Sequence, residues 1–299
     1  MQALYAFQQS PNEDLVNAET QLFSSIDKIY DLYLYLLLLP AELADCARVA
    51  GFVAKHFPTK EHLVVTRFSE NLFIKQLMQN SFFLKEIKKR VISWKGNEEL
   101  VQKLFVEIKN TPLFKKYILS EEHTFASDKA FVLEMFSKHI VPSTDLQSFI
   151  EEKNIFWNNS EHWMAGVALK SLEKLNGGAD KNFLVPVFKD ESDKTFVREL
   201  FMHTIIFGKE YEQSISEKTK NWEMERIALM DVILMKMALV ELVHFKFIPV
   251  KVSINEYLDI ARDYSTPKSN AFINGIIDKL SAEFKANGKI QKIGAGLVE

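Results

Sequence analysis

Residues that interrupt helices are scarce in this chain, which has 10 Gly and 8 Pro among its 299 residues. β-Sandwiches, β-barrels and Gly-rich nucleotide-binding folds need many turns, and Gly and Pro form most of them. The scarcity therefore predicts long helices, and the 24 Phe residues suit a helical core filled with aromatic side chains. We predict an all-α fold built as a helical bundle. A hydrophobic fraction of 47% excludes a chain that is disordered throughout.

Cysteine content and net charge narrow the classes of function. The single cysteine, Cys46, excludes a disulfide framework and a metal site built from cysteines, and it favours a reducing compartment such as the cytoplasm. The formal net charge of −3 excludes a generally basic nucleic-acid-binding protein. Any contact with RNA or DNA must therefore use a local basic patch.

The most apolar stretch, Ile29 to Leu39, is too short to cross a membrane. It contains Asp31 and ends before Pro40, after far fewer than the ~20 residues that a membrane-spanning helix needs. No charged and then apolar signal peptide follows Met1. We predict that this stretch is a buried helix that stops at Pro40, in a protein without a membrane segment.

Several helix boundaries are marked by capping residues. Apolar residues in 272–284 follow the helical period, with Thr266 and the proline after it as the start and Gly288 as the stop. Thr144 begins another helix. Residues 253–256, Ser-Ile-Asn-Glu, have the pattern of a capping box and predict a helix that starts at this serine.

An internal repeat relates residues 127–157 to residues 192–222. Both segments open with Ser-Asp-Lys and end with Trp, in register and without a gap. We interpret them as copies of one two-helix unit, in which Ser127 and Ser192 are the N-caps and the following Asp lies in the first turn. The alternative is two unrelated helix pairs with similar packing faces.

None of the side-chain sets that catalysis or metal binding requires is found in the sequence. The seven His residues form no His-x-x-x-His pair, and HEXXH, Cys-x-x-Cys, Walker and Gly-x-Ser-x-Gly motifs are absent. Gly294-Ala295-Gly296 has no helix after it, and we interpret it as a frayed tail. We predict no enzymatic activity, no cofactor and no metal ion.

One carboxylate, Glu241, lies on the apolar stripe that Met230, Leu234 and Met237 form. A charged side chain on a core stripe must be paired or hydrogen-bonded. We predict that Glu241 caps the helix that starts at Ser253, rather than binding a ligand.

Lys, Arg, Ser and Asn gather near two expected helix starts late in the chain, where basic residues outnumber acidic ones. They are Lys251, Arg262, Lys268, Ser269, Asn270, Asn274 and Lys279. Helix N-termini combined with such side chains are typical of a surface for single-stranded RNA, although a solvated helix face has the same composition.

Three stretches of the same region, 226–242, 248–265 and 272–278, resemble the signature of the NusB family. The matched positions are Trp222, Arg226, Asp231, Leu239, Glu241, Pro249, Ile254, Asn255, Glu256, Ala261, Phe272, Asn274 and Gly275. The similarity covers about 192–285, and Met1 to Tyr5 resembles the end of the family's first helix. The resemblance implies an all-helical transcription antitermination factor. It would pair with the ribosomal protein NusE, bind the boxA element of ribosomal RNA leaders and join the transcription elongation complex.

The resemblance also implies which residues contact RNA and NusE. The positions where the family meets RNA are Gln2, Tyr5, Lys236, Lys251, Lys268, Ser269, Asn270 and Asn274. The positions near NusE are Glu225, Asp231 and Val250. Lys236 replaces an arginine of the family motif, which keeps the charge but loses bidentate geometry.

Two departures from the family pattern shape the expected domains. The family's first helix opens with an arginine cluster that touches RNA, and Met1 already lies past that point. Either the start codon is assigned late, or part of the RNA surface is missing. A long insert follows the first helix. We expect three regions: an N-terminal helical region at 1–125, a degenerate repeat at 126–190 and a NusB-like RNA-binding domain at 191–299. Within the first region, everything after the first helix belongs to the insert.

Two other functions remain open at this stage. One is a helical protein-interaction scaffold with reduced RNA binding, which the acidic net charge favours. The other is an accessory domain related to those of RNA cytosine methyltransferases, and the lack of a catalytic domain after Phe284 counts against it.

Overall fold

The computed structural model describes residues 1–10, 14–54, 66–176, 183–219 and 227–297, and every regular element within these residues is helical. The prediction of an all-α fold is therefore confirmed. The chain divides into two compact units, which we call unit 1 (residues 1–23 and 188–299) and unit 2 (residues 24–187).

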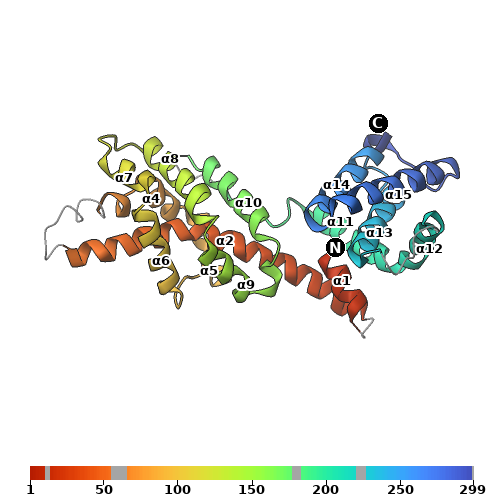
Figure 1. Cartoon of the computed structure of the whole chain (residues 1–299), viewed down its shortest axis with the longest axis horizontal. Helices are drawn as coiled ribbons and strands as arrows, with labels where there is room; N and C mark the ends of the chain where they lie inside the picture. Colours follow the sequence, from red (N-terminus) through yellow and green to blue (C-terminus); the bar gives the residue numbers. More distant parts are fainter. Residues whose placement is uncertain (11–13, 55–65, 177–182, 220–226, 298–299) are drawn as a thin grey trace. The chain divides into compact units, whose positions relative to one another are not determined.

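Unit 1 is built around one helix whose side chains are almost all buried. This helix is α13 (Leu229–His244), and every residue from Asp231 to Leu242 is buried. The helices of unit 1 that pack against it are α1 (Gln2–Gln9), α11 (Glu191–Ile206), α12 (Gly208–Lys218), α14 (Val250–Tyr264) and α15 (Pro267–Ala286) (Figure 1). Their apolar faces together enclose α13, which explains why its sequence has no polar stripe.

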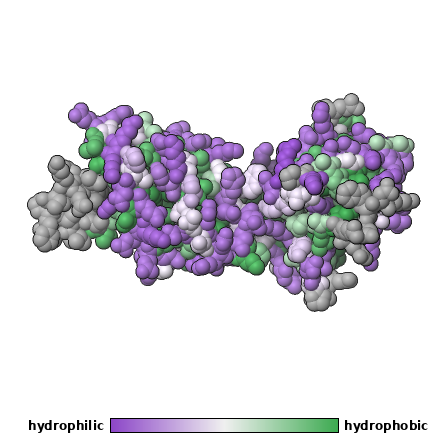
Figure 2. Space-filling view, viewed as in Figure 1, coloured by the Kyte–Doolittle hydropathy of each residue, from purple (hydrophilic) through white to green (hydrophobic). Residues whose placement is uncertain are grey.

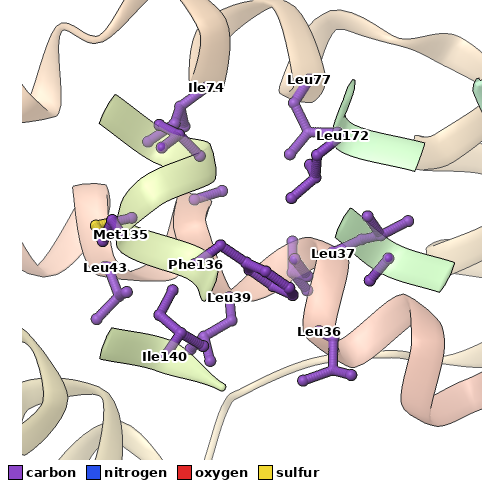
Figure 3. Packing of buried hydrophobic residues seen from close by; sticks show 14 of the residues in the cluster. Leu36, Leu37, Leu39, Leu43, Ile74, Leu77, Met135, Phe136, Ile140 and Leu172 are labelled. Carbon is purple, nitrogen blue, oxygen red and sulfur yellow. The ribbon is translucent and has the colours of Figure 1, made fainter. Parts of the chain in front are cut away.

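Unit 2 is organised along residues 24–54 of the long helix α2 (Leu15–Ala54), whose first residues belong to unit 1. The other helices of unit 2 are α4 (Leu72–Gln79), α5 (Ser81–Arg90), α6 (Glu98–Lys109), α7 (Pro112–Leu119), α8 (Phe125–Met135), α9 (Thr144–Lys153) and α10 (Glu161–Lys174). A π-helical turn (Phe136–Ile140) continues α8, and a 3₁₀ turn (Ile155–Trp157) follows α9. Figure 3 shows leucines of α2 in one core with Ile74, Phe136 and Leu172.

Helix α2 confirms that Ile29 to Leu39 is a buried helix, but the predicted stop at Pro40 is wrong. The helix runs through Pro40 to Ala54. Proline removes one backbone hydrogen bond, yet Leu39 and Leu43 on either side are fully buried, and this packing holds the chain helical. No helix in the described residues is long and apolar enough to span a bilayer, and the face of each unit seen in Figure 2 is largely hydrophilic.

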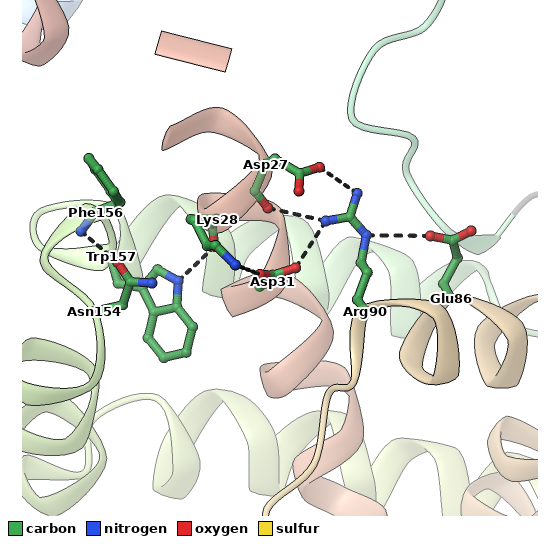
Figure 4. Close-up of polar contacts among 8 residues, drawn as sticks. All are labelled: Asp27, Lys28, Asp31, Glu86, Arg90, Asn154, Phe156 and Trp157. Carbon is green, nitrogen blue, oxygen red and sulfur yellow. Dashed lines mark hydrogen bonds and ion pairs between the residues drawn. The ribbon is translucent and has the colours of Figure 1, made fainter. Parts of the chain in front are cut away.

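A polar cluster fixes α2 to α5 and to the turn after α9. The Arg90 guanidinium donates to the carboxylates of Asp27 at 2.6 Å and Asp31 at 2.9 Å, and both carboxylates raise the pKa of this guanidinium. The Trp157 indole Nε1 donates to the backbone carbonyl of Lys28 at 2.6 Å. Figure 4 shows these contacts on one stretch of α2. Hydrogen-bonded, partly buried charges of this kind order the helices that carry them.

The predicted start of α9 and both predicted ends of α15 are confirmed, and the predicted start of α14 is wrong. Helix α9 begins at Thr144, and α15 has Thr266 as its N-cap, with Gly288 in the left-handed conformation at its end. Helix α14 begins at Val250, directly after a proline, so Ser253 lies one turn inside the helix and is buried. The fixed φ of the proline starts the helix before the capping-box residues are reached.

Both segments of the predicted repeat form helices, but their N-caps were predicted wrongly. Thr124 caps α8 and Asp190 caps α11, each upstream of the predicted serine, because their side-chain oxygens reach the free backbone N–H groups first. The aspartates, Asp128 and Asp193, do lie in the first turns. Trp157 is buried, whereas Trp222 lies outside the described residues. That the two segments superpose stays a prediction.

The two units differ from the expected division of the chain. The boundary expected between residues 125 and 126 lies inside unit 2, because Phe68 and Phe114 pack against Phe131 from beyond it. The boundary expected between 190 and 191 lies close to the change of unit after Val187. The first helix and the C-terminal region, which the sequence separates, belong to one unit.

Candidate nucleic-acid interface

A groove of about 740 Å³ lies between α14 and α15 in unit 1. Helix α14 contributes Lys251 and Asn255, and α15 contributes Asn274 and Lys285. The segment that follows α15 forms a third wall, with Ile290, Lys292, Gly296 and Leu297. Two of the predicted RNA contacts, Lys251 and Asn274, are therefore brought together in one concave site.

The charge of this groove is mainly positive. Lys251 and Lys285 are exposed, Lys292 is half-buried, and the only acidic side chain among the described lining residues is Asp278. The Lys292 ammonium donates to the backbone carbonyls of Glu241 at 3.3 Å and Phe245 at 2.9 Å, at the C-terminal end of α13. Burial lowers the pKa of Lys292 to about 8. The lining thus combines amine donors with the amide groups of two asparagines, a set that suits phosphates and base edges.

The start of α15 carries three further predicted RNA contacts, of which one faces solvent. Lys268 is exposed. Ser269 donates its backbone N–H to the Thr266 hydroxyl at 3.2 Å, and its own hydroxyl lies 3.0 Å from the same atom. The Asn270 amide donates to the backbone carbonyl of Leu258 at 2.8 Å, which joins α15 to α14. Ser269 and Asn270 therefore hold the helix start in place.

Lys236, also predicted to contact RNA, is buried, with only 5% of its surface exposed. Its ammonium pairs with the carboxylate of Glu212 on α12. Lys236 lies in a second groove of unit 1, of about 710 Å³, together with residues of α1, α11 and α12. The sequence could not show this burial, because it results from the packing of α12 across α13.

Of the predicted contacts on α1 and the predicted NusE contacts that fall within the described residues, one lines the α14–α15 groove. Gln2 and Tyr5 are exposed on α1 and line neither wall of that groove. Asp231 is buried and accepts a hydrogen bond from the Ser265 hydroxyl at 2.5 Å, so it fixes the end of α14. Val250 is partly buried and lines the groove. Glu225 lies outside the described residues.

Glu241 does not cap α14, as was predicted. Its carboxylate accepts a hydrogen bond from the Tyr257 hydroxyl at 2.9 Å, in the middle of α14. Burial and this carboxylate raise the pKa of Tyr257 well above its ordinary value. Because α14 begins at Val250, its free N–H groups lie about two turns from the residue that Glu241 reaches.

The third wall of the groove was missed from the sequence, where it was interpreted as a frayed tail. Gly296 is buried, and a Cβ atom at this position would lie 2.1 Å from the backbone oxygen of Lys246. The backbone N–H of Ile293 donates to the same oxygen at 3.0 Å. Lys285 could have been found from its helical spacing relative to Asn274, whereas nothing local marks Lys292. Within the described residues, no group of three or more His, Cys, Asp and Glu gathers as a metal site.

Comparison with known proteins supports the resemblance noted from the motifs. The NusB family model matches residues 166–282, which include α11 to α14 and most of α15. A transcription antitermination protein NusB of Salinibacter ruber is 40% identical over 114 residues, which are 38% of this chain and 71% of that protein.

Two further relatives carry the same name. The protein of Chloroherpeton thalassium is 38% identical over 113 residues, covering 38% of this chain and 54% of its own, and that of Trichlorobacter lovleyi is 36% identical over 102 residues, covering 34% and 72%. No solved structure matches the chain. Since the chain covers more than two thirds of a relative that is 40% identical to it, it belongs to the NusB family.

Proposed function

We propose that this protein is a transcription antitermination factor that binds a boxA-type RNA strand through the α14–α15 groove, together with NusE, during ribosomal RNA transcription. The observation that supports the proposal most is the gathering of Lys251, Lys285 and Lys292 in one groove with Asn255 and Asn274. Family membership and the names of the relatives support the general function. They also favour a non-enzymatic protein that works in the cytoplasm.

In this proposal the groove, together with Lys268 and Tyr5 of unit 1, binds RNA through its phosphates and its bases. Lys251, Lys268 and Lys285 contact phosphates, which gives affinity that depends on salt, and the amide of Asn274 contacts base edges. Tyr5, which is 42% exposed, offers a ring on which a base can stack.

Three of the residues implied by the family act indirectly. Lys236 and Asn270 hold α12 to α13 and α15 to α14, so they support the RNA surface without touching RNA. Asp231 fixes the end of α14 through Ser265. Val250 lies at a position where the family meets NusE, and it remains the proposed contact with that partner. The RNA surfaces of this chain and of NusE, joined in one complex, bind the RNA more tightly than either does alone.

Fluorescence anisotropy with a boxA-type RNA and a scrambled RNA, each with and without NusE, tests the proposal. We expect the chain to prefer the boxA-type RNA, with a larger preference when NusE is present. Replacing Lys251 and Lys285 by alanine should weaken binding about tenfold and reduce the salt slope by about 1.4, since each phosphate contact contributes about 0.7 for a single strand.

The matched control replaces Lys85 and Lys115, two exposed lysines of unit 2, by alanine. This variant has the same net charge as the groove variant, and we expect it to bind RNA like the unmodified chain. Equal binding of the two RNAs in both conditions would refute the proposed specificity. Equal losses in the two lysine variants would refute the proposed location.

A further inference from the structure

Unit 2 contains a groove of about 830 Å³ that the family resemblance does not explain. It lies between α2 and α6, in a part of the chain that precedes the residues matched by the family model. Glu42, Cys46 and Val49 line it from α2, and Val101, Phe105 and Val106 line it from α6.

The spacing of the lining residues describes the shape of a suitable occupant. On α2 they follow one another at i, i+4 and i+7, and on α6 at i, i+4 and i+5. The residues at i and i+4 on each helix therefore form a stripe turned toward the same groove, and Val106 lies beside this stripe on α6. Two helices that present such stripes to a common space form the seat that a third helix fills in a helical bundle.

Part of this groove is apolar surface that the described residues leave uncovered. Val49 is 65% exposed and Val106 is 45% exposed, while Val101 and Phe105 form a buried floor beneath them. Covering exposed valine side chains removes apolar surface from water and favours binding. An occupant with its own apolar stripe fits this floor.

The charge of the groove specifies one further property of the occupant. Glu42 is half-buried, and among the described residues its carboxylate has no hydrogen bond or ion pair. Burial, and then the nearby carboxylates of Asp45 and Glu98, raise the pKa of Glu42. Arg48, nearly two turns further along α2, is paired with Asp45 at 2.8 Å. Lys95 and Lys109 also line the groove, and neither forms an ion pair with Glu42 within the described residues. A cation from outside would therefore be stabilised beside Glu42.

We propose that the groove between α2 and α6 docks an amphipathic helix of a partner protein, whose apolar stripe contains one Lys or Arg that pairs with Glu42. This inference is independent of the proposed RNA function, because it concerns only unit 2. It gives the insert a role in protein binding, with the apolar floor providing affinity and Glu42 selecting for the cation.

The test uses the full chain and two fluorescein-labelled synthetic peptides. Both are helices of Leu, Ala and Gln with leucines at i, i+3, i+4 and i+7, and they differ in one central position of the leucine stripe, which is Lys or Glu. We expect saturable binding of the Lys peptide, about tenfold tighter than the Glu peptide, because like charges repel. The E42Q variant should remove most of this difference.

The location is tested with charge-matched variants and with the single thiol. Val106→Glu should weaken binding of the Lys peptide at least about tenfold. Leu119→Glu adds the same charge at an exposed site of unit 2 outside the groove, and it should leave binding of the peptide unchanged. Saturating peptide should also slow the alkylation of Cys46, which lines the groove, by iodoacetamide.

Three results would overturn the proposal. They are absence of saturable binding by either peptide, equal loss of binding in the two glutamate variants, and alkylation of Cys46 at the same rate with and without peptide. Sedimentation velocity tests a different occupant: a dimer of the full chain that Val106→Glu dissociates and Leu119→Glu does not would show that a second copy fills the groove.

Discussion

Unit 1 and unit 2 are both helical, but they use their charged and polar side chains in different places. In unit 2, the buried Asp128 accepts hydrogen bonds from the Tyr117 hydroxyl at 2.9 Å and the Leu72 backbone at 2.7 Å, and Arg90 pairs with two aspartates of α2. In unit 1, Lys251 and Lys285 face an open groove. Arg90 and Asp128 thus stabilise packing in unit 2, whereas Lys251 and Lys285 remain available for a ligand in unit 1.

The apolar cores differ in a related way. Phe68 in unit 2 has ring contacts with Phe105, Phe114 and Phe131, whereas the buried apolar side chains that α13 itself contributes to the core of unit 1 are all aliphatic or Met. A core of interlocking rings depends on each ring, because its neighbours cannot easily collapse into the space that one leaves. We therefore expect substitutions of the aromatic core of unit 2 to affect stability, and substitutions of the exposed lysines of unit 1 to affect binding.

The largest expected effect is on the core of unit 2. Phe68→Ala should lower the free energy of unfolding by about 3–5 kcal/mol, because it removes a fully buried ring and leaves a cavity. Urea unfolding followed by circular dichroism measures the loss, with Leu119→Ala, at a site that is 82% exposed, as the control. RNA binding below the unfolding transition should not change. A loss of RNA affinity in the folded variant would contradict the separation between the units.

The next effect concerns the buried carboxylate of unit 1. Tyr257→Phe should lower the free energy of unfolding by about 1–3 kcal/mol, because Glu241 would lose the hydroxyl that donates to it. Thermal unfolding measures this change, and Tyr5→Phe, at an exposed hydroxyl, is the matched control. If the two variants unfolded at the same temperature, the hydrogen bond between α13 and α14 would not stabilise the unit.

Substitutions of two glycines test whether the segment after α15, the third wall of the α14–α15 groove, is packed against the rest of unit 1. Gly296→Ala should cost about 1–3 kcal/mol, because its Cβ would overlap the backbone of Lys246. Gly275→Ala in α15 has open space around the new Cβ and should stabilise the helix by up to about 1 kcal/mol. Chemical unfolding of both variants tests this difference, and changes of the same sign would show that the segment after α15 is not packed as described.

The smallest effect is a pH dependence in unit 1. Burial, and then the neighbouring His203, lower the pKa of His244 below its ordinary value of 6.5, although Glu210 opposes the shift. The unfolded chain therefore binds more protons than the folded chain in mild acid. The free energy of unfolding should fall as the pH drops through 6.5 toward the lowered pKa, and should level off below it.

The Nε2 atom of His244 lies 3.0 Å from the Tyr211 hydroxyl, and the imidazole ring is stacked on the ring of Phe207. Unfolding measured between pH 7.5 and 5 should show a smaller acid-dependent loss in His244→Gln than in the unmodified chain. His123→Gln, at an exposed site in unit 2, should keep the full loss. An identical pH profile in the two variants would assign the acid sensitivity to other groups.

Local sequence patterns predicted the helices and several of their ends, because capping depends on residues that are close in the chain. Thr266 and Gly288 bound α15 as expected. Tertiary contacts decided what the patterns could not show. Lys236 is buried because α12 crosses it, and Gly296 is anchored because the chain folds back onto Lys246.

The candidate site was predicted in part for the same reason. Lys251 and Asn274 occur in motifs and were found, whereas Lys292 joins the groove only through contacts with the end of α13. Asp231 and Asn270 occur in the same motifs, yet both form hydrogen bonds within unit 1. A family motif therefore indicates which positions matter without separating contact with a partner from support of the fold.

Crosslinking of a 4-thiouridine-substituted boxA-type RNA to the full chain, followed by mass spectrometry of the crosslinked peptides, tests most directly whether unit 1 binds RNA and unit 2 does not. We predict crosslinks to residues of α14, the start of α15 and α1, and a decrease when Lys251 and Lys285 are replaced by alanine. Crosslinks that fall mainly within residues 24–187, and that persist in this variant, would contradict the account.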